Sequence, residues 1–375
     1  MKKIIYLDNG ATTPVYPEVI KEMNKFYSEK YGNPSSPHEL GEAALKEMNS
    51  ARRKIAQEIL AKVFEIIFTS GGTEANNLAI LGLANANPGK KKIIISAIEH
   101  SSVYESCMAL KEKGYKIIEI PVDNNGLADI GYLERAIDNK TLLVSIIHAN
   151  NEIGVLQDLS IIGKICKRKG VIFHTDAVQS FGKEKINVRD FAIDMLSASA
   201  HKISGPKGIG FLYIREGIKI SPLIIGGGQE HGIRGGTENV PAIAGFAKAL
   251  EITKKIDKNK IKKLRDYFAD ELEKIGGKIN GSKEKRLYNN INVSFNGING
   301  DDLVLFLSEK GIMCSTKSAC LSKQKKENRV LKALGLKKDE LNGAVRFSLN
   351  EKTKRKDLDK VLNEISSFLS HSKLY

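Results

Sequence analysis

A lysine lies within a run of small residues near the middle of the chain, in the segment Ser197–Gly205, which reads SASAHKISG. Small side chains allow a bulky planar molecule to approach the backbone. A lysine near apolar side chains and other cations has a lowered pKa, which makes its amine a nucleophile suited to Schiff-base chemistry. Loop lysines are common, so this segment alone leaves an ordinary structural role for Lys202 open.

Other segments carry groups that would complement such a lysine. Asp176 ends an apolar run, where a carboxylate suits the ring nitrogen of pyridoxal 5'-phosphate (PLP), although an aspartate there is also a common helix N-cap. The segment Thr69–Glu74 reads TSGGTE, and glycines with hydroxyl residues before a helix can cradle a phosphate or form a plain turn. His100 could stack on a ring and move protons near neutral pH, and Asn151 lies in another polar segment.

These groups need elements that bring them together, and the pattern from about residue 50 to 215 supplies such elements. Short apolar runs alternate with amphipathic stretches, which predicts an α/β domain with a mostly parallel seven-stranded sheet. The expected strands are Glu65–Thr69, Lys92–Ser96, Lys116–Pro121, Leu142–His148, Val171–Asp176, Met195–Ser199 and Gly210–Ile214. The expected helices include Glu74–Ala86, Val103–Lys113, Ile130–Ile137 and Leu159–Lys169. Because ligands bind beyond the carboxyl ends of parallel strands, the candidate groups are expected to meet at one edge of the sheet.

The rest of the chain is expected to form a smaller unit. A long charged helix is predicted at Pro241–Ile275, with its lysine-rich part connecting the two units. Beyond it, strands are expected at Asn290–Phe295 and Ala344–Leu349, and helices at Asp301–Glu309 and Lys356–Leu369. We therefore predict a large α/β domain over residues 16–255 and a small α+β domain formed by residues 1–15 and 256–375.

Composition narrows the class of protein. Hydrophobic residues make up 41% and charged residues 27% of the 375 residues, as in soluble globular proteins. The N-terminal apolar run is too short for a signal peptide, and no stretch approaches the roughly 20 residues that cross a bilayer, so a cytoplasmic location is expected. Four cysteines without zinc spacing indicate neither a disulfide scaffold nor a resident metal site.

The formal net charge of +15 is carried by separate lysine runs without interleaved aromatic residues. That pattern favours solvated helix faces over a stacking platform for nucleic acid. A basic face that attracts tRNA or an acidic protein stays open as an alternative.

Taken in their order along the chain, these segments resemble the cysteine desulfurases of the NifS/IscS type, a branch of the class V aminotransferases with the type I PLP fold. The resemblance runs almost end to end, from YLDNGATTP at Tyr6–Pro14 to RFSL at Arg346–Leu349. It includes the segments Gly32–Ser36, His148–Gly154, Gly226–Glu230 and Gly235–Thr237.

The resemblance implies a role for each matching residue. Lys202 would bind PLP covalently, Asp176 would pair with the pyridine nitrogen, and His100 would stack on the ring and shuttle protons. The other cofactor-binding residues would be Gly72, Thr73, Asn151, Gln179, Ser199, His201 and Thr237. Of these, Thr237 would reach in from the second subunit of a homodimer. Asn33, Asn151 and Arg346 would bind the substrate, L-cysteine.

The segment CSTKSACLSK, which begins at Cys314, resembles the family's loop that ends in Ser-Ala-Cys. By this resemblance Cys320 would receive the sulfur as a persulfide, alanine would leave, and the sulfur would pass to an acceptor such as an iron–sulfur scaffold or a thiolation enzyme. No membrane, nucleic acid or resident metal is expected, although Cys320 could transiently ligate an iron–sulfur cluster. A selenocysteine lyase or another class V aminotransferase is the alternative function, and a non-catalytic RNA-binding protein is a more distant one.

Overall fold

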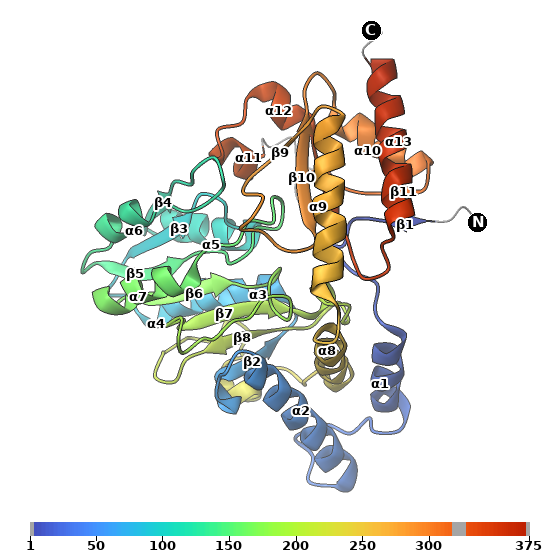
Figure 1. Ribbon diagram of the computed structural model, residues 1–375. Helices are drawn as coiled ribbons and strands as arrows, with labels where there is room; N and C mark the ends of the chain where they lie inside the picture. The colour runs from blue at the N-terminus through green and yellow to red at the C-terminus, as the bar shows by residue number, and fades with distance from the viewer. Residues whose placement is uncertain (1–3, 317–327, 373–375) are drawn as a thin grey trace.

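The largest element of the computed structural model, which describes residues 4–316 and 328–372, is a sheet of seven strands (Figure 1). In order across the sheet the strands are β2 (Ile66–Thr69), β8 (Gly210–Ile214), β7 (Met195–Ser199), β6 (Ile172–Asp176), β5 (Thr141–Ser145), β3 (Lys92–Ser96) and β4 (Lys116–Ile120). Strand β8 runs antiparallel to both of its neighbours, and the other pairings are parallel. The predicted α/β fold with a mostly parallel seven-stranded sheet is therefore confirmed.

Helices cover both faces of this sheet, which is why its inner strands are buried along almost their whole length, whereas the edge strand β4 is partly exposed. Strand β3, for example, is buried at every position. The helices of this part are α1 (Pro17–Ser28), α2 (Glu39–Glu58), α3 (Gly72–Asn77), α4 (Leu83–Ala86), α5 (Ser101–Glu112), α6 (Ile130–Ala136), α7 (Leu159–Lys169) and α8 (Val240–Thr253). One apolar core joins the sheet to α2, α7 and α8, and a second lies under α3, α4 and α5.

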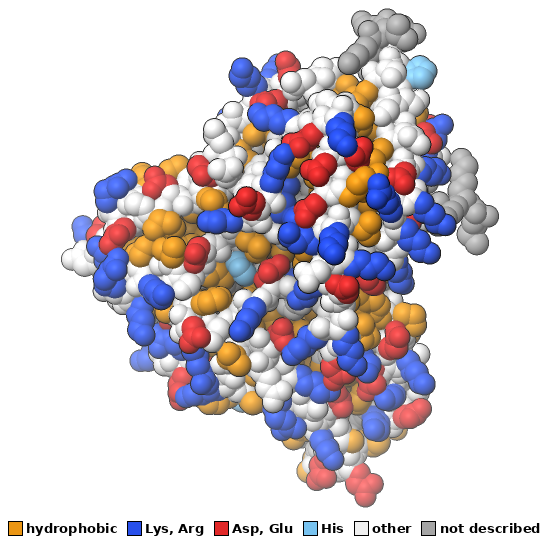
Figure 2. Space-filling model, viewed as in Figure 1, with side chains coloured by type: hydrophobic (Ala, Val, Ile, Leu, Met, Phe, Trp, Pro, Cys, Tyr) orange, Lys and Arg blue, Asp and Glu red, His pale blue; other side chains and the backbone are white. Residues whose placement is uncertain are grey.

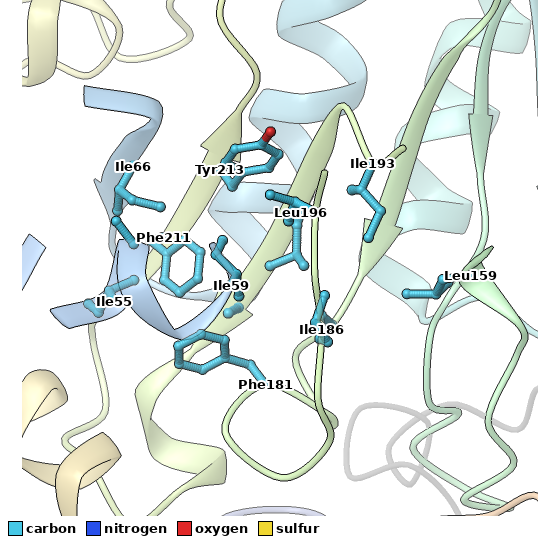
Figure 3. Close-up of a cluster of buried hydrophobic side chains, with 14 of the residues drawn as sticks. Ile55, Ile59, Ile66, Leu159, Phe181, Ile186, Ile193, Leu196, Phe211 and Tyr213 are labelled. Atoms are coloured by element: carbon cyan, nitrogen blue, oxygen red, sulfur yellow. The ribbon is translucent and has the colours of Figure 1, made fainter. Parts of the chain in front are cut away.

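Aromatic and branched side chains fill the first of these cores (Figure 3). Phe181 and Phe211 meet edge to face, with ring centroids 5.0 Å apart, and Phe246 of α8 packs against both rings. Leu196 of β7 and Ile55 of α2 belong to the same buried cluster. This rigid packing fixes the strand ends beyond which the candidate site residues lie.

A smaller antiparallel sheet carries the rest of the chain. Its order is β12 (Ala344–Ser348), β10 (Asn290–Phe295) and β9 (Gly277–Ile279). A separate parallel pair joins β1 (Ile5–Tyr6) to β11 (Ile312–Met313). The helices here are α9 (Lys258–Lys274), α10 (Gly300–Glu309), α11 (Arg329–Ala333), α12 (Lys338–Asn342) and α13 (Arg355–Ser372). This part has its own apolar core, to which the N-terminal residues Ile5 and Leu7 contribute. The exact division at residues 15 and 255 stays a prediction.

The prediction of one long helix at Pro241–Ile275 is wrong. The chain forms α8 and α9 instead, and it breaks between Thr253 and Lys258. The physical reason is a helix start signal: the Asp257 carboxylate accepts a hydrogen bond from the backbone N–H of Lys260 at 3.0 Å and caps α9. Among the described residues, no helix combines the length and the apolar character that a membrane span requires.

Candidate active site

The segments that follow the carboxyl ends of the parallel strands surround a cavity of about 200 Å³. The N-terminal segment at Gly10 and Ala11 and strand β12 complete its lining. Ten of the predicted site residues line it: Gly72, Thr73, His100, Asn151, Asp176, Gln179, Ser199, His201, Lys202 and Arg346. The structure thus brings these ten residues together, and their individual roles stay predictions.

Lys202 provides the amine of this cavity. It ends a single 3-10 turn, Ala200–Lys202, directly after β7. Its Nζ donates hydrogen bonds to the carbonyl oxygens of Gly10 at 2.8 Å and Ala11 at 2.7 Å. Burial, with added repulsion from Arg346 and Lys183, lowers the pKa of the Lys202 amine to about 7. An amine with that pKa is partly unprotonated near neutral pH, as attack on a carbonyl carbon requires.

Asp176 provides a buried carboxylate at the end of β6. Its Oδ1 accepts a hydrogen bond from the backbone N–H of Val178 at 2.9 Å, and its Oδ2 accepts one from Nδ2 of Asn76 at 2.8 Å. Asn76, on α3, also donates to the Ser102 hydroxyl at 2.8 Å, while its own Oδ1 lacks a hydrogen-bond partner. A carboxylate oxygen has more than one lone pair, so Asp176 can still accept a hydrogen bond from a ring nitrogen.

His100 is the N-cap residue of α5. Its Nδ1 accepts a hydrogen bond from the backbone N–H of Ser102 at 3.2 Å and lies 2.8 Å from the Ser102 hydroxyl. Burial lowers the pKa of the imidazole; Asp176 opposes this shift, whereas Lys202 and Arg329 add to it. The ring is therefore neutral near pH 7, and because Nδ1 accepts the backbone N–H, the proton is assigned to Nε2.

The turn between β2 and α3 offers a place for an anion. Gly71 has a φ of +152°, and a Cβ on Gly72 would lie 2.5 Å from Cγ2 of Val178, so both positions require glycine. The first N–H groups of a helix have no partner within the helix, and the helix dipole adds to their attraction for an anion. Three further groups of the cavity can donate to the same anion: Thr73, Ser199 and His201.

Arg346 provides a second cation, from β12 in the smaller part of the chain. Its side chain is only 1% exposed, and its Nη2 donates to Oδ1 of Asp8 at 2.7 Å. Its Nη1 donates to the Asn151 carbonyl at 2.9 Å, while the buried Nε has no hydrogen-bond partner. A guanidinium that lines a cavity and keeps one N–H without a partner is well suited to bind a carboxylate.

Two predicted site residues lie outside this cavity. Asn33 is exposed after α1, where its Oδ1 accepts a hydrogen bond from the backbone N–H of Ser35 at 2.9 Å. Thr237 lines a separate hollow with Ser70 and Arg234. Cys320 lies outside the described residues. In the part of the chain that the structure describes, no three His, Cys, Asp or Glu side chains lie close enough to bind a metal ion.

Sequence reasoning missed several residues that shape the cavity. Asn76 lies one helical turn after Gly72, and this spacing could have indicated that it faces the same site. Asp8 and Gly10 gave no such signal, because their partners Arg346 and Lys202 are 338 and 192 positions away in the sequence. The tertiary fold alone brings these pairs together.

Comparison with known proteins adds to this geometry. The family model described as Aminotransferase class-V matches residues 5–361. The chain belongs to the class-V aminotransferase family. The family is PLP-dependent, and among its members the chain belongs with the cysteine desulfurases of the NifS/IscS group, as predicted.

Three relatives illustrate this membership. "Cysteine desulfurase IscS" from Dictyoglomus turgidum is 45% identical, over 98% of this chain and 95% of its own length. A solved structure described as "NIFS-LIKE PROTEIN" is 39% identical with a TM-score of 0.93, over 98% of this chain and all of that chain. A structure described as "SspA in complex with cysteine" is 38% identical with a TM-score of 0.84, over 93% of this chain and 99% of that chain.

Proposed function

We propose that this cysteine desulfurase removes sulfur from L-cysteine with PLP held by Lys202, and that Cys320 takes up the sulfur. The main support is that one cavity combines the Lys202 amine, whose pKa is lowered to about 7, with the buried carboxylate of Asp176. The proposed reaction balances. The C–S bond of cysteine breaks, one sulfur atom joins the Cys320 thiol as a persulfide, and alanine leaves.

The residues of the cavity fit PLP. Lys202 would hold the aldehyde carbon, Asp176 would accept a hydrogen bond from the ring nitrogen, and His100 would stack on the ring. The N–H groups at the start of α3 would hold the phosphate together with Thr73, Ser199 and His201, and Gln179 and Asn151 would lie near the phenolic oxygen. The partnerless Oδ1 of Asn76 supports this fit, because it is a second buried acceptor beside Asp176 that could share the N–H of the protonated ring nitrogen. When bound, PLP draws electrons away from the substrate Cα.

Arg346 and Asn151 would bind the substrate. The partnerless Nε of Arg346 supports a carboxylate ligand, and the hydrogen bonds from Arg346 to Asp8 and to the Asn151 backbone fix the guanidinium in place. Asn33 has no described contact that supports its predicted role in substrate binding. The residues that act on the substrate Cα proton would be Lys202, whose amine can accept it, and His100, whose Nε2 can donate one.

Cys320 would come close enough to receive the sulfur because the chain just before it is fixed beside the cavity. The backbone of Ser315 exchanges hydrogen bonds with that of Arg346, at 2.6 and 3.3 Å, and the Thr316 hydroxyl donates to Asp301 at 2.6 Å. Cys320 follows Thr316 by four residues, so the length of the chain limits their separation to about 14 Å.

The proposal extends to a homodimer in which Thr237 of one subunit completes the phosphate site of the other. Two observations support it. Thr237 lies outside the cavity of its own chain, and two consecutive apolar residues near it, Ile224 and Ile225, are 41% and 87% exposed, in a segment that is hydrogen-bonded to Gly235. A second protein, either an iron–sulfur scaffold or a thiolation enzyme, would receive the sulfur in the cytoplasm. Lys and Arg on the face in Figure 2 are interleaved with Asp and Glu, which gives no support to a nucleic-acid platform.

The sulfur-transfer step is tested by comparing Cys320→Ala with Cys314→Ala. Cys314 is a matched control, because it lies six positions earlier in the sequence but is buried in the smaller apolar core. We expect both variants to keep the absorbance of bound PLP. Only Cys320→Ala should lose alanine release from cysteine and the mass increase of one sulfur atom on the protein. Full alanine release by Cys320→Ala would contradict the role of Cys320 and favour a lyase that needs no thiol acceptor.

A further inference from the structure

The short helix α11, in the smaller part of the chain, packs against the loops of the large part that carry His100 and Asn151. Val330, Leu331 and Leu334 at this helix belong to a buried apolar cluster with residues of the large part that include Ile98, Ile147 and Ile153. Ile98 lies two residues before His100, and Ile153 lies two residues after Asn151. The helix is therefore packed directly against the rim of the cavity.

Asn328 ties the start of this helix to one of these loops. Its Oδ1 accepts a hydrogen bond from the backbone N–H of Leu331 at 3.0 Å and so caps the helix. Its Nδ2 donates to Oε2 of the buried Glu152 at 2.6 Å. One side chain thus both begins α11 and fixes it beside Asn151.

Arg329 holds the turn that carries His100. Its Nη1 donates to the carbonyl oxygen of Ala97 at 2.5 Å, and its Nη2 donates to the carbonyl oxygen of Glu99. Its guanidinium carbon also lies 4.1 Å from the ring centroid of Tyr104, in the first turn of the helix that His100 caps. Arg329 therefore contacts the chain on both sides of His100, and its side chain is 27% exposed.

Glu99 holds the same turn from inside the protein. Its Oε1 accepts hydrogen bonds from the Ser96 hydroxyl and from the backbone N–H of Ile147, the latter at 2.8 Å. Burial raises the pKa of this carboxyl to about 8, so Glu99 is mostly neutral at pH 7. Arg329 is thus not paired with a Glu99 carboxylate, and its two hydrogen bonds in this turn go to backbone carbonyls.

We propose that Arg329 is a positioning residue that holds His100 in the geometry that desulfuration requires. The inference rests on the proposed function, in which His100 acts at the substrate. Neither the hydrogen bonds nor the ring contact of Arg329 touches the cavity itself, so the residue acts through His100.

The effect of the Arg329 charge can be distinguished from the effect of its hydrogen-bonding geometry by two different substitutions. The charged groups that act on His100 are Asp176 from β6, Lys202 from the turn after β7, and Arg329 from α11. Replacement of Arg329 by Lys keeps the positive charge, but an ammonium cannot reproduce the planar fork that binds two carbonyls and stacks on a ring. Replacement by Gln removes the charge as well, so the pKa of His100 should rise.

The test uses the PLP-loaded enzyme and measures alanine formation from cysteine across a range of pH. The variants are Arg329→Lys and Arg329→Gln, with Arg355→Gln as the matched control. Arg355 makes the same ring contact elsewhere, since its guanidinium carbon lies 4.1 Å from the Tyr267 centroid. For both Arg329 variants we expect kcat to fall about tenfold while KM and PLP content stay near wild type, because a displaced catalytic group slows only the step it serves. The part of the kcat profile that the His100 imidazole controls should move to higher pH in Arg329→Gln but not in Arg329→Lys.

Three results would overturn this inference. One is a kcat within twofold of wild type in both Arg329 variants. Another is an equal loss of kcat in Arg355→Gln, which would show a general effect on folding. The third is a loss of PLP or a rise in KM without a change in kcat. A wild-type enzyme that released no alanine from cysteine would instead refute the proposed function.

Discussion

Two hollows lie at opposite ends of the seven-stranded sheet, and charged side chains line both. The hollow at the carboxyl ends of the parallel strands measures about 200 Å³ and contains Lys202, Asp176 and Arg346. The hollow at the amino ends measures about 570 Å³ and contains Lys62, Arg215 and other charged residues. By size alone, the larger hollow would be taken for the active site.

The two hollows differ in how their charges are solvated. At the amino ends, Lys62 pairs with Glu216 and Arg215 pairs with Asp194, and about half of each cationic side chain is exposed. At the carboxyl ends the side chain of Arg346 is buried, the pKa of Lys202 is lowered to about 7, and polar atoms lack partners. Desolvation and unmet hydrogen bonds, rather than volume, therefore distinguish a site prepared for a ligand.

The largest expected effect comes from replacing one lysine at each end of the sheet and comparing the activities of the two variants. Lys202→Ala should lower alanine formation by about 10²- to 10⁴-fold, because the variant loses both the amine that holds PLP and a proton acceptor. Lys62→Ala removes a lysine of the other hollow. Its exposed ion pair with Glu216 contributes little stability, so activity should stay near wild type. The measurement is steady-state alanine release, combined with the absorbance spectrum of each purified protein. Unchanged absorbance and activity in Lys202→Ala would remove the basis for the cofactor site.

A smaller effect is expected from one arginine at each end. Arg346→Gln should raise KM for cysteine by about 100-fold, because the substrate carboxylate loses a buried charged partner worth several kcal/mol. Arg215→Gln, which breaks the half-exposed pair with Asp194, should leave KM unchanged. Initial rates over a wide range of cysteine concentration measure both values. A similar KM in the two variants would mean that the carboxylate binds elsewhere.

The sequence allowed accurate prediction of strands and of the candidate groups that follow them, because each is marked by a short local pattern. Strands β3, β7 and β8 begin and end where their apolar runs predicted, and the candidate groups after the strands do converge. The order of the strands across the sheet was not predicted, because it depends on tertiary packing. Helices α1 and α2 were not predicted either, although α2 spans 20 residues.

The contacts that the sequence did not reveal are those between distant segments. Lys202 donates to the Gly10 and Ala11 carbonyls, and nothing in either segment indicates the other. The break between α8 and α9 was missed for a different reason. The helical pattern is nearly continuous there, so the cap signal of Asp257 was overlooked. Long-range pairing and the competition between a cap and a continuing helix are decided by the whole fold.

The smallest expected effect tests whether water is excluded from the interior of the sheet between the two hollows. His174 lies within β6, between the Ser145 hydroxyl at 2.8 Å and the Ser197 hydroxyl at 2.9 Å, and burial lowers its pKa to about 3. In the unfolded chain a histidine has a pKa of about 6.5, so at intermediate pH the unfolded state binds a proton that the folded state does not. The stability that His174 contributes is therefore complete above about pH 6.5 and declines as the pH falls towards 3.

Between pH 8 and pH 5.5 this loss should amount to about 1.4 kcal/mol of unfolding free energy, and His174→Gln should lack it. The exposed His371 provides the control, since His371→Gln should lose stability with pH as the wild type does. Denaturant unfolding at several pH values measures the difference. If wild type and His174→Gln lost stability in parallel, water or a counter-charge would have to reach β6 from the larger hollow, and the contrast between a dry and a solvated end of the sheet would fail.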